Sequence, residues 1–378
     1  MLAACQQPAP SVGPGGAPPA TSGQQPAVER ARFTKVTYAD LPGWADDAHE
    51  QAFAAFLQSC AALARAPAGT AKLLNDAREA CAATSGVAPG DRAAARAFFE
   101  RWFQPYRATS PSGRDGLFTG YFEALLRGAR QGSARYPVPL YIRPPDLARE
   151  DDPARGIRMV GRMENGVLKP YATRAEIDAG ALQGRHLELA WVDSAIDAFV
   201  LHVQGSGRVV LDNGSELRVG VDGTNGWPYT SIGAVLVERG ALLREDVTLQ
   251  SIRAWLAANP GEARAVMQRN ARYVFFRELR GPGPLGALGV PVTPGRSLAV
   301  DPRSVPLGFP LWLDTTDPRD GPPLRRLVMA QDVGAAIQGA VRGDLFWGAG
   351  PQAEDAAGRM RSRGGYFLLY PHAAAPGS

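Results

Sequence analysis

Two aspartates separated by a glycine-rich segment are the residues of this chain best suited to acid chemistry. Asp332 follows an apolar run at 327–330, and Asp344 stands after three further glycines and just before the apolar residues 345–347. Apolar surroundings and a nearby negative charge both raise the pKa of a carboxyl group. A carboxylic acid that stays protonated near neutral pH can protonate the leaving oxygen when a glycosidic bond breaks. The alternative interpretation is an aspartate-capped turn followed by a solvated aspartate.

This segment resembles the C-terminal three-aspartate (3D) domain of the membrane-bound lytic murein transglycosylase A (MltA) family. The matching acids are Asp301 in AVDPRSVPLG, Asp332 in QDVGAAIQG and Asp344 in RGDLFWG. Two residues depart from the family pattern DxGGAIKG, because Ala335 replaces its second glycine and Gln338 replaces its lysine. Both departures lie between the acids, so they affect the geometry and charge of the loop more than the acids themselves.

The resemblance extends through the middle of the chain in three more blocks. They are LFTGYFEALLRGARQGSARYPVPLYIRP at 117–144, AFVLHVQGSGRVVLDNG at 198–214 and NGWPYTSIG at 225–233. Asp222-Gly223-Thr224 stands where relatives usually have Ala-Gly-Lys, so a lysine often found there is missing. Four blocks in the family order make the resemblance specific, although no single block would.

The resemblance implies a lytic transglycosylase that cleaves the β-1,4 bond between MurNAc and GlcNAc in peptidoglycan and leaves a 1,6-anhydro ring. It assigns the single acid and base to Asp344, with Asp332 raising its pKa or orienting it. Asp301 is expected to be structural, since Asp-Pro followed by proline and glycine predicts a turn. Residues expected to contact the sugar are Gln204, Gly205, Ser206, Gly207, Thr119, Tyr121 and Trp227. A tight turn at 203–207 is the alternative for the first four.

Two other functions remain open on the sequence. One is a peptidoglycan hydrolase with two working carboxylates, Asp344 as the acid and Asp332 activating water. The other is a non-catalytic glycan-binding lipoprotein, which Ala335, Gln338 and Thr224 favour and the retention of both acids opposes. Only a transglycosylase leaves anhydro ends on its products, so product analysis separates these functions.

Composition and charge limit the class of protein. The chain has 378 residues, enough for two domains, and its 43 glycines and 32 prolines favour a loop-rich, β-rich fold. The net charge of +4 is too diffuse to indicate nucleic acid as a partner. The four histidines are scattered and none pairs at metal-ligand spacing, so neither a metal site nor a cofactor is expected.

The three cysteines indicate where in the cell the protein is expected to act. Cys5 ends the lipobox-like sequence LAAC, and the resemblance implies an outer-membrane lipoprotein in the periplasm whose signal peptide is truncated here. The expected partners are glycan strands, the inner leaflet of the outer membrane through a lipid anchor, and a wall-remodelling complex. Cys60 and Cys81 remain as a pair, and we expect them to form a disulfide in an oxidising compartment; two buried free thiols are the alternative.

The periodicity of apolar residues and the resemblance to the family together predict four segments in the chain. Residues 1–29 read as a lipobox remnant and a disordered tether, 30–122 as an N-terminal helical part, 123–275 as an inserted β-domain and 276–374 as the 3D domain. The family fold is mainly β with N-terminal helices. Its N-terminal and 3D parts build a double-psi β-barrel, and the glycan lies in a groove between the barrel and the inserted domain.

Local patterns predict the individual elements. Helices are expected at 46–66, 70–83, 91–103, 174–179, 231–238 and 249–258. Strands are expected at 117–121, 136–142, 187–192, 198–203, 208–211, 270–276, 298–300, 311–313, 327–330 and 366–370. The aromatic residues crowded at 98–103 are expected to be core more than sugar contacts.

Overall fold

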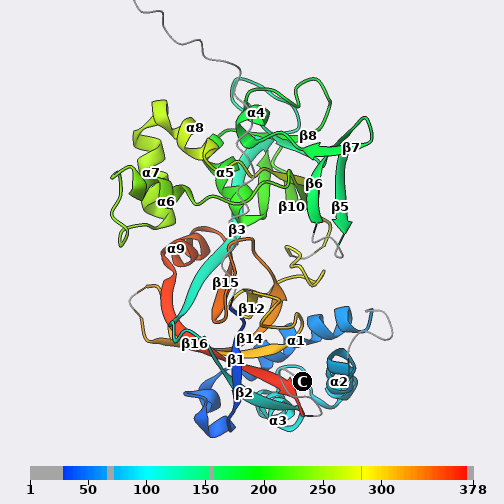
Figure 1. The fold of residues 1–378 in the computed structure, drawn as a ribbon. Coiled ribbons are helices and arrows are strands. Elements are labelled where there is room, and N and C mark those ends of the chain that lie inside the picture. The colour runs from blue at the N-terminus through cyan, green and yellow to red at the C-terminus, as the bar shows by residue number, and fades with distance from the viewer. Residues whose placement is uncertain (1–28, 66–71, 153–156, 282, 320, 373–378) are drawn as a thin grey trace, which may run out of the picture.

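The computed structural model describes residues 29–65, 72–152, 157–281, 283–319 and 321–372 and arranges them in two lobes (Figure 1). The lower lobe in the view holds the N-terminal helices and the C-terminal strands, and the upper lobe holds the middle of the chain. The architecture is mainly β with N-terminal helices, as the sequence predicts.

Three helices follow the first strand and pack on the lower lobe. The order is β1 (Arg32–Lys35), the short 3-10 helices η1 (Tyr38–Asp40) and η2 (Trp44–Asp46), α1 (His49–Leu63), α2 (Lys72–Ala82), η3 (Ala83–Gly86) and α3 (Arg92–Trp102). Asp91 begins α3 by accepting a hydrogen bond from the Ala94 amide at 2.9 Å. Phe98 of α3 packs edge-on against Phe53 of α1 with ring centroids 5.0 Å apart. These aromatic residues are therefore core, as expected.

Six strands of the lower lobe close into a ring, which we call the C-terminal ring. In order they are β3 (Gly116–Ala129), β16 (Arg361–Pro371), β13 (Pro310–Thr316), β14 (Pro323–Asp332), β12 (Ser297–Val300) and β15 (Arg342–Ala349). The ring closes because β16 pairs with both β13 and β3. Two neighbouring pairs are parallel, β12 with β14 and β15 with β3. β2 (Phe103–Thr109) joins β1 to the outer edge of β16.

Buried apolar side chains fill the interior of the C-terminal ring. Phe118, Leu298, Leu311, Leu345 and Leu368 come from five of its strands, and each is 0% exposed. Because side chains alternate along a strand, these positions fix which neighbours point outward. The residues on either side of Phe118 and Leu345 therefore face away from the core.

The upper lobe contains a second closed set of strands, the central ring. It consists of β3, β9 (Ser206–Leu211), β10 (Glu216–Thr224), β11 (Val274–Glu278), β4 (Val138–Tyr141) and β8 (Glu188–Val192). A parallel bridge between Ile142 and Phe276 links β4 to β11 and closes the set. β3 belongs to both rings, because its first half pairs with β15 and its second half with β9.

Helices and a small sheet surround the central ring. They are β5 (Leu147–Asp152), β6 (Ile157–Glu164), β7 (Val167–Pro170), α4 (Arg174–Asp178), α5 (Ala195–Gln204), α6 (Ile232–Glu238), α7 (Leu249–Ala258) and α8 (Pro260–Gln268). α9 (Pro351–Arg359) connects β15 to β16 in the lower lobe.

The strand predicted at 198–203 is wrong, because these residues form most of α5. Ser194 caps the helix by accepting a hydrogen bond from the Asp197 amide at 3.1 Å, and Gly205 ends it in the left-handed conformation with φ of 81°. Residues 198–202 are all buried and the exposed residue that follows, Val203, is also apolar, so the run lacks the polar face that distinguishes a helix from a strand. The helix signals lay in the flanking Ser194 and Gly205.

Candidate active site

A cleft of about 1010 Å³ lies between the two lobes. Asp301, Asp332 and Asp344 line it from the side of the C-terminal ring. Gln204 to Ser206, at the junction of α5 and β9, line it from the side of the central ring. The structure thus brings the three aspartates and most of the VQGSG segment to one cleft at a lobe interface, a common place for a ligand site.

Asp344 projects from β15 toward this cleft. Its register neighbours are Ala299 on β12 and Thr119 on β3, and the adjacent Leu345 points into the core. Burial by the walls of the cleft raises the pKa of Asp344 above its ordinary value. The charge of Arg342 and the Thr119 hydrogen bond oppose this rise, and the charge of Asp332 adds to it. Burial, and not the second aspartate, is the main cause of the raised pKa.

Arg342 and Thr119 fix how the Asp344 carboxyl group is oriented. Arg342 Nη2 donates to Thr119 Oγ1 at 2.9 Å, and Thr119 Oγ1 donates to Asp344 Oδ1 at 2.6 Å. A guanidinium group can only donate, so the hydroxyl of Thr119 must accept there and give its own proton to Asp344. Oδ1 is thereby an acceptor, which leaves Oδ2 to carry the proton of the neutral acid. Oδ2 has no hydrogen-bond partner among the described residues.

Asp332 ends β14 with both of its oxygens engaged. Oδ1 accepts from the amides of Val333 at 2.8 Å and Ala287 at 2.9 Å, and Oδ2 accepts from the Tyr121 hydroxyl at 3.0 Å. Burial raises the pKa of Asp332, and the three hydrogen bonds oppose that rise. The arrangement ties the segment at 284–292 to the end of β14, beside Asp344.

Gln331, which the sequence analysis did not single out, anchors this end of β14 to helix α1. Its Nε2 donates to the carbonyl of Ala55 at 2.8 Å and to Ser59 Oγ at 3.0 Å, and its Oε1 accepts from Ser297 Oγ at 2.5 Å. The side chain is 0% exposed, so each of its polar atoms needs such a partner. In the sequence, the feature that could have identified Gln331 is its position as a polar residue at the end of an apolar run.

Asp301 holds the loop between the other two acids. Oδ1 accepts from the amide and Nε of Arg303, and Oδ2 accepts from Arg303 Nη2 and from the Gly339 amide, the last two both at 2.8 Å. Burial acts to raise the pKa of Asp301, but the bonds from Arg303 and Gly339 outweigh it and lower that pKa. Asp301 is therefore an ionised anchor for the loop at 333–341.

The residues expected to contact sugar fall into three groups. Tyr121, Gln204, Gly205 and Ser206 line the cleft, and Gln204 Oε1 also accepts from the Phe122 amide of β3 at 3.0 Å. Thr119 contacts Asp344 rather than lining the cleft. Gly207 and Trp227 lie outside the lining: a Cβ on Gly207 would meet the Ala124 carbonyl at 2.8 Å, and Trp227 Nε1 donates to the Tyr171 carbonyl at 2.8 Å.

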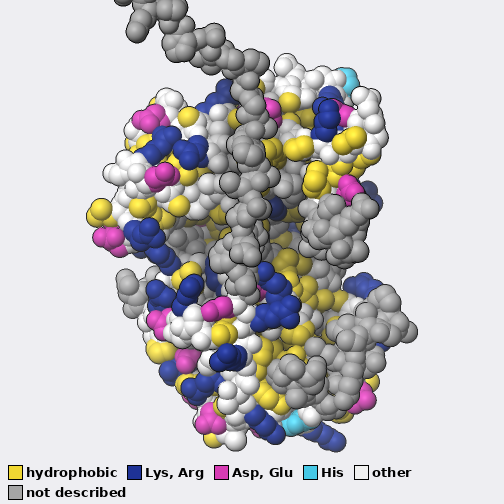
Figure 2. All heavy atoms as spheres, in the orientation of Figure 1, with side chains coloured by type: hydrophobic (Ala, Val, Ile, Leu, Met, Phe, Trp, Pro, Cys, Tyr) yellow, Lys and Arg dark blue, Asp and Glu magenta, His cyan; other side chains and the backbone are white. Residues whose placement is uncertain are grey.

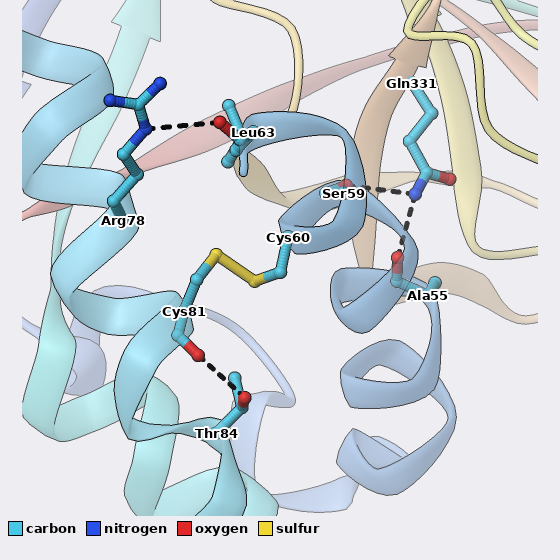
Figure 3. The surroundings of a disulfide bond; sticks show 8 residues. All are labelled: Ala55, Ser59, Cys60, Leu63, Arg78, Cys81, Thr84 and Gln331. Carbon is cyan, nitrogen blue, oxygen red and sulfur yellow. Dashed lines mark hydrogen bonds between the residues drawn. A yellow bond between two sulfur atoms is a disulfide. The ribbon is translucent and has the colours of Figure 1, made fainter. Parts of the chain in front are cut away.

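Cys60 and Cys81 form a disulfide that joins α1 to α2, with an S–S distance of 2.04 Å (Figure 3). On the other side of α1, Gln331 reaches Ala55 and Ser59, so the bridge secures the helix that supports the end of β14. Cys5, the expected lipidation site, lies outside the described residues.

The described part of the chain contains no group of three histidine, cysteine or acidic side chains arranged to hold a metal ion. None of the helices in these same ranges is both long and apolar enough to cross a membrane.

Two family descriptions match consecutive parts of the chain. "MltA specific insert domain" matches residues 117–277, and "3D domain" matches residues 296–370. The fold and the site thus define a protein in which an MltA-type central domain and a 3D domain face each other across an acid-bearing cleft.

Individual relatives agree with this class. The chain is similar to membrane-bound lytic murein transglycosylase A of Escherichia coli strain K12, with 34% identity over 261 residues that cover 67% of this chain and 65% of that protein. A membrane-bound lytic murein transglycosylase from Agrobacterium tumefaciens has a similar crystal structure, with a TM-score of 0.82, 34% identity, and coverage of 91% of this chain and 98% of that one. Escherichia coli MltA with bound chitohexaose gives a TM-score of 0.68 and 26% identity, over 92% and 97% of the two chains. The chain belongs to the membrane-bound lytic murein transglycosylase A family.

Proposed function

We propose that the protein is a peptidoglycan lytic transglycosylase that cleaves the β-1,4 bond between MurNAc and GlcNAc and forms 1,6-anhydroMurNAc. The observation that carries the proposal is the orientation of Asp344, a carboxyl group with a raised pKa whose proton is directed onto Oδ2 beside the cleft. The names of the relatives support the same activity, and the chitohexaose bound to Escherichia coli MltA supports a glycan as the ligand.

One carboxyl group is sufficient for this reaction. Asp344 Oδ2 gives its proton to the glycosidic oxygen as the bond from that oxygen to C1 of MurNAc breaks. The C6 hydroxyl oxygen of the same sugar then bonds to C1, and its proton passes to the Asp344 carboxylate. The products are a free GlcNAc hydroxyl and an anhydro ring, no water is consumed, and the acid is restored for another turnover.

Asp332 acts in this scheme by positioning its surroundings. Its two oxygens already accept three hydrogen bonds, from Val333, Ala287 and Tyr121, so they are poorly available to activate a water molecule. This engagement favours the single-acid mechanism over a hydrolase with two working carboxylates. Tyr121, Gln204, Gly205 and Ser206 are the residues of the cleft that we assign to contacts with the sugar rings.

The finer architecture belongs to the same proposal. We infer that the C-terminal ring is a double-psi β-barrel, which its six strands and two parallel pairs support. The proposed division is a tether at 1–29, a barrel built from 30–122 and 276–374, and an inserted domain at 123–275. The boundary at 122/123 then falls inside β3, at the point where this strand passes from one ring to the other.

The location follows from the family and not from the fold. The relatives are named membrane-bound, which supports an outer-membrane lipoprotein that faces the periplasm and is anchored through Cys5. Its partners are then glycan strands and a wall-remodelling complex.

Mass spectrometry of purified sacculi digested with the protein tests the function. The expected products carry 1,6-anhydroMurNAc ends, and an Asp344→Asn variant, which keeps the size of the side chain, yields none above background. Products with reducing MurNAc ends would instead establish the hydrolase. Binding to sacculi without release of any product would establish the non-catalytic glycan binder.

A further inference from the structure

A second cavity, of about 440 Å³, lies beside β16, which pairs with one edge of β3. Asp344 lies on β15, which pairs with the other edge of β3. The cavity is lined by Leu117, Glu245, Val247, Thr248, Arg359, Arg361 and Arg363. The loop before α7 forms its upper wall, and the end of α9 with the start of β16 forms the lower wall. Figure 2 shows Lys and Arg side chains gathered where the two lobes meet.

The register of the strands connects this cavity to the acid. Arg361 of β16 pairs with Thr119 of β3, which in turn pairs with Asp344 of β15. Residues in register across neighbouring strands project from the same face of a sheet. Strands lie ~4.8 Å apart, so two strand spacings separate the backbones of Arg361 and Asp344 by about 10 Å.

The charges in the cavity are unbalanced in favour of an anion. Three guanidinium groups face one carboxylate, that of Glu245. Arg359 Nε is engaged with Asp355 at 2.7 Å, and Arg361 Nη1 donates to the Arg244 carbonyl at 2.9 Å. The guanidinium of Arg363 makes no hydrogen bond or ion pair with the described residues. Arginine presents a planar fork of donors that matches a carboxylate with two parallel hydrogen bonds.

We propose that this arginine cavity binds a carboxylate of the peptide stem carried by the MurNAc unit at the cleavage site. The inference rests on the proposed function, because peptidoglycan supplies the stem as well as the glycan. Three extended residues span about 10 Å, the separation between the backbones of the acid and the cavity. The structure therefore places a receptor for the peptide within reach of the sugar that reacts.

The test compares glycan strands that keep their stems with the same strands after the stems have been removed. Release of anhydro products is measured for the wild type and for the double variant Arg361→Gln/Arg363→Gln, and kcat/KM is determined on both substrates. We expect the ratio of kcat/KM on stem-bearing strands to that on stripped strands to fall about tenfold in the variant, the scale of one charge-assisted hydrogen bond. The fall should appear in KM and should shrink at high salt.

Two further variants separate specific recognition from general charge. Arg361→Lys/Arg363→Lys keeps both charges and should restore part of the ratio. Arg130→Gln/Arg239→Gln removes two charges from exposed ion pairs with Glu278 and Glu262, and it should leave the ratio unchanged. An unchanged ratio in Arg361→Gln/Arg363→Gln, with its melting temperature retained, would overturn the stem site. If the wild type forms no anhydro product on either substrate, the proposed function itself fails.

Discussion

Removal of the Arg342 charge is the perturbation that most directly tests how Asp344 is controlled. Arg342 lowers the pKa of Asp344 and stabilises the carboxylate, while burial raises that pKa. In Arg342→Gln the burial remains and the opposing charge is lost, so the pKa of Asp344 rises further. The first step of the proposed reaction needs the protonated acid, so the alkaline limb of the pH–rate profile moves to higher pH.

The magnitude follows from the geometry of the hydrogen-bond chain. The bonds of 2.9 and 2.6 Å share Thr119 Oγ1, so Arg342 Nη2 and Asp344 Oδ1 are at most about 5.5 Å apart. At that distance two unit charges interact by between about 0.8 kcal/mol in bulk water and 3 kcal/mol at an effective dielectric constant of 20. For each protein, the rate at alkaline pH is divided by the rate on its own acidic plateau. On the alkaline limb this normalised rate should be about fourfold to 150-fold higher in Arg342→Gln than in the wild type.

The assay is kcat/KM for release of anhydro products across pH. Arg342→Lys is the matched control, because it keeps the charge but loses the fork that reaches Thr119 and two backbone carbonyls. It should lower the plateau and leave the alkaline limb close to that of the wild type. If Arg342→Gln folds and its alkaline limb coincides with that of the wild type, protonation of Asp344 does not limit the rate and the single-acid scheme is wrong.

Three further predictions concern single features of the molecule. Asp344→Asn should keep the fold and lose ~10²-fold to 10⁴-fold or more in turnover, whereas Asp332→Asn should be milder; equal losses at every pH would favour a hydrolase with two carboxylates. Replacing Cys60 and Cys81 by alanine should lower the free energy of unfolding by about 3 kcal/mol, measured with denaturant, because the bridge closes a loop with a sequence separation of 21. Asp47→Asn should lower it by about 3–5 kcal/mol, since the buried Arg296 loses its partner at 2.8 Å; Asp314→Asn, in an exposed pair with Arg325, serves as the control and should change it by less than ~1 kcal/mol.

The sequence located the two proposed site acids better than the groups that control them. Glycine punctuation and apolar flanks drew attention to Asp332 and Asp344, and the resemblance to the family supplied their expected roles. Arg342 could not be found in this way, because its role depends on Thr119, 223 residues earlier in the chain. The contribution of burial to the pKa of Asp344 likewise depends on walls built from distant segments.

Local patterns also predicted the elements unevenly. The predicted helices at 174–179, 231–238 and 249–258 agree with α4, α6 and α7, and each of these begins at a serine or threonine whose side chain accepts a backbone hydrogen bond. The prediction of a strand at 198–203 was wrong because this stretch of α5 is apolar all round, so its sequence shows no polar face. Trp227, within the family block at 225–233, was expected to contact the sugar, yet its indole Nε1 donates to the Tyr171 carbonyl and the side chain lies outside the lining of the cleft. Aromatic character alone does not indicate whether a side chain faces ligand or core.

The sharing of β3 between both rings has a mechanical consequence. A hydrogen-bonded strand is stiff along its length, and β3 is held by β15 and β16 at one end and by β8 and β9 at the other. Thr119 and Tyr121 lie just before the point where it leaves the first ring. A change in the angle between the lobes would bend β3 there and tilt the hydroxyls that contact Asp344 and Asp332. The width of the cleft and the orientation of the Asp344 carboxyl group would therefore change together, because both depend on the curvature of β3.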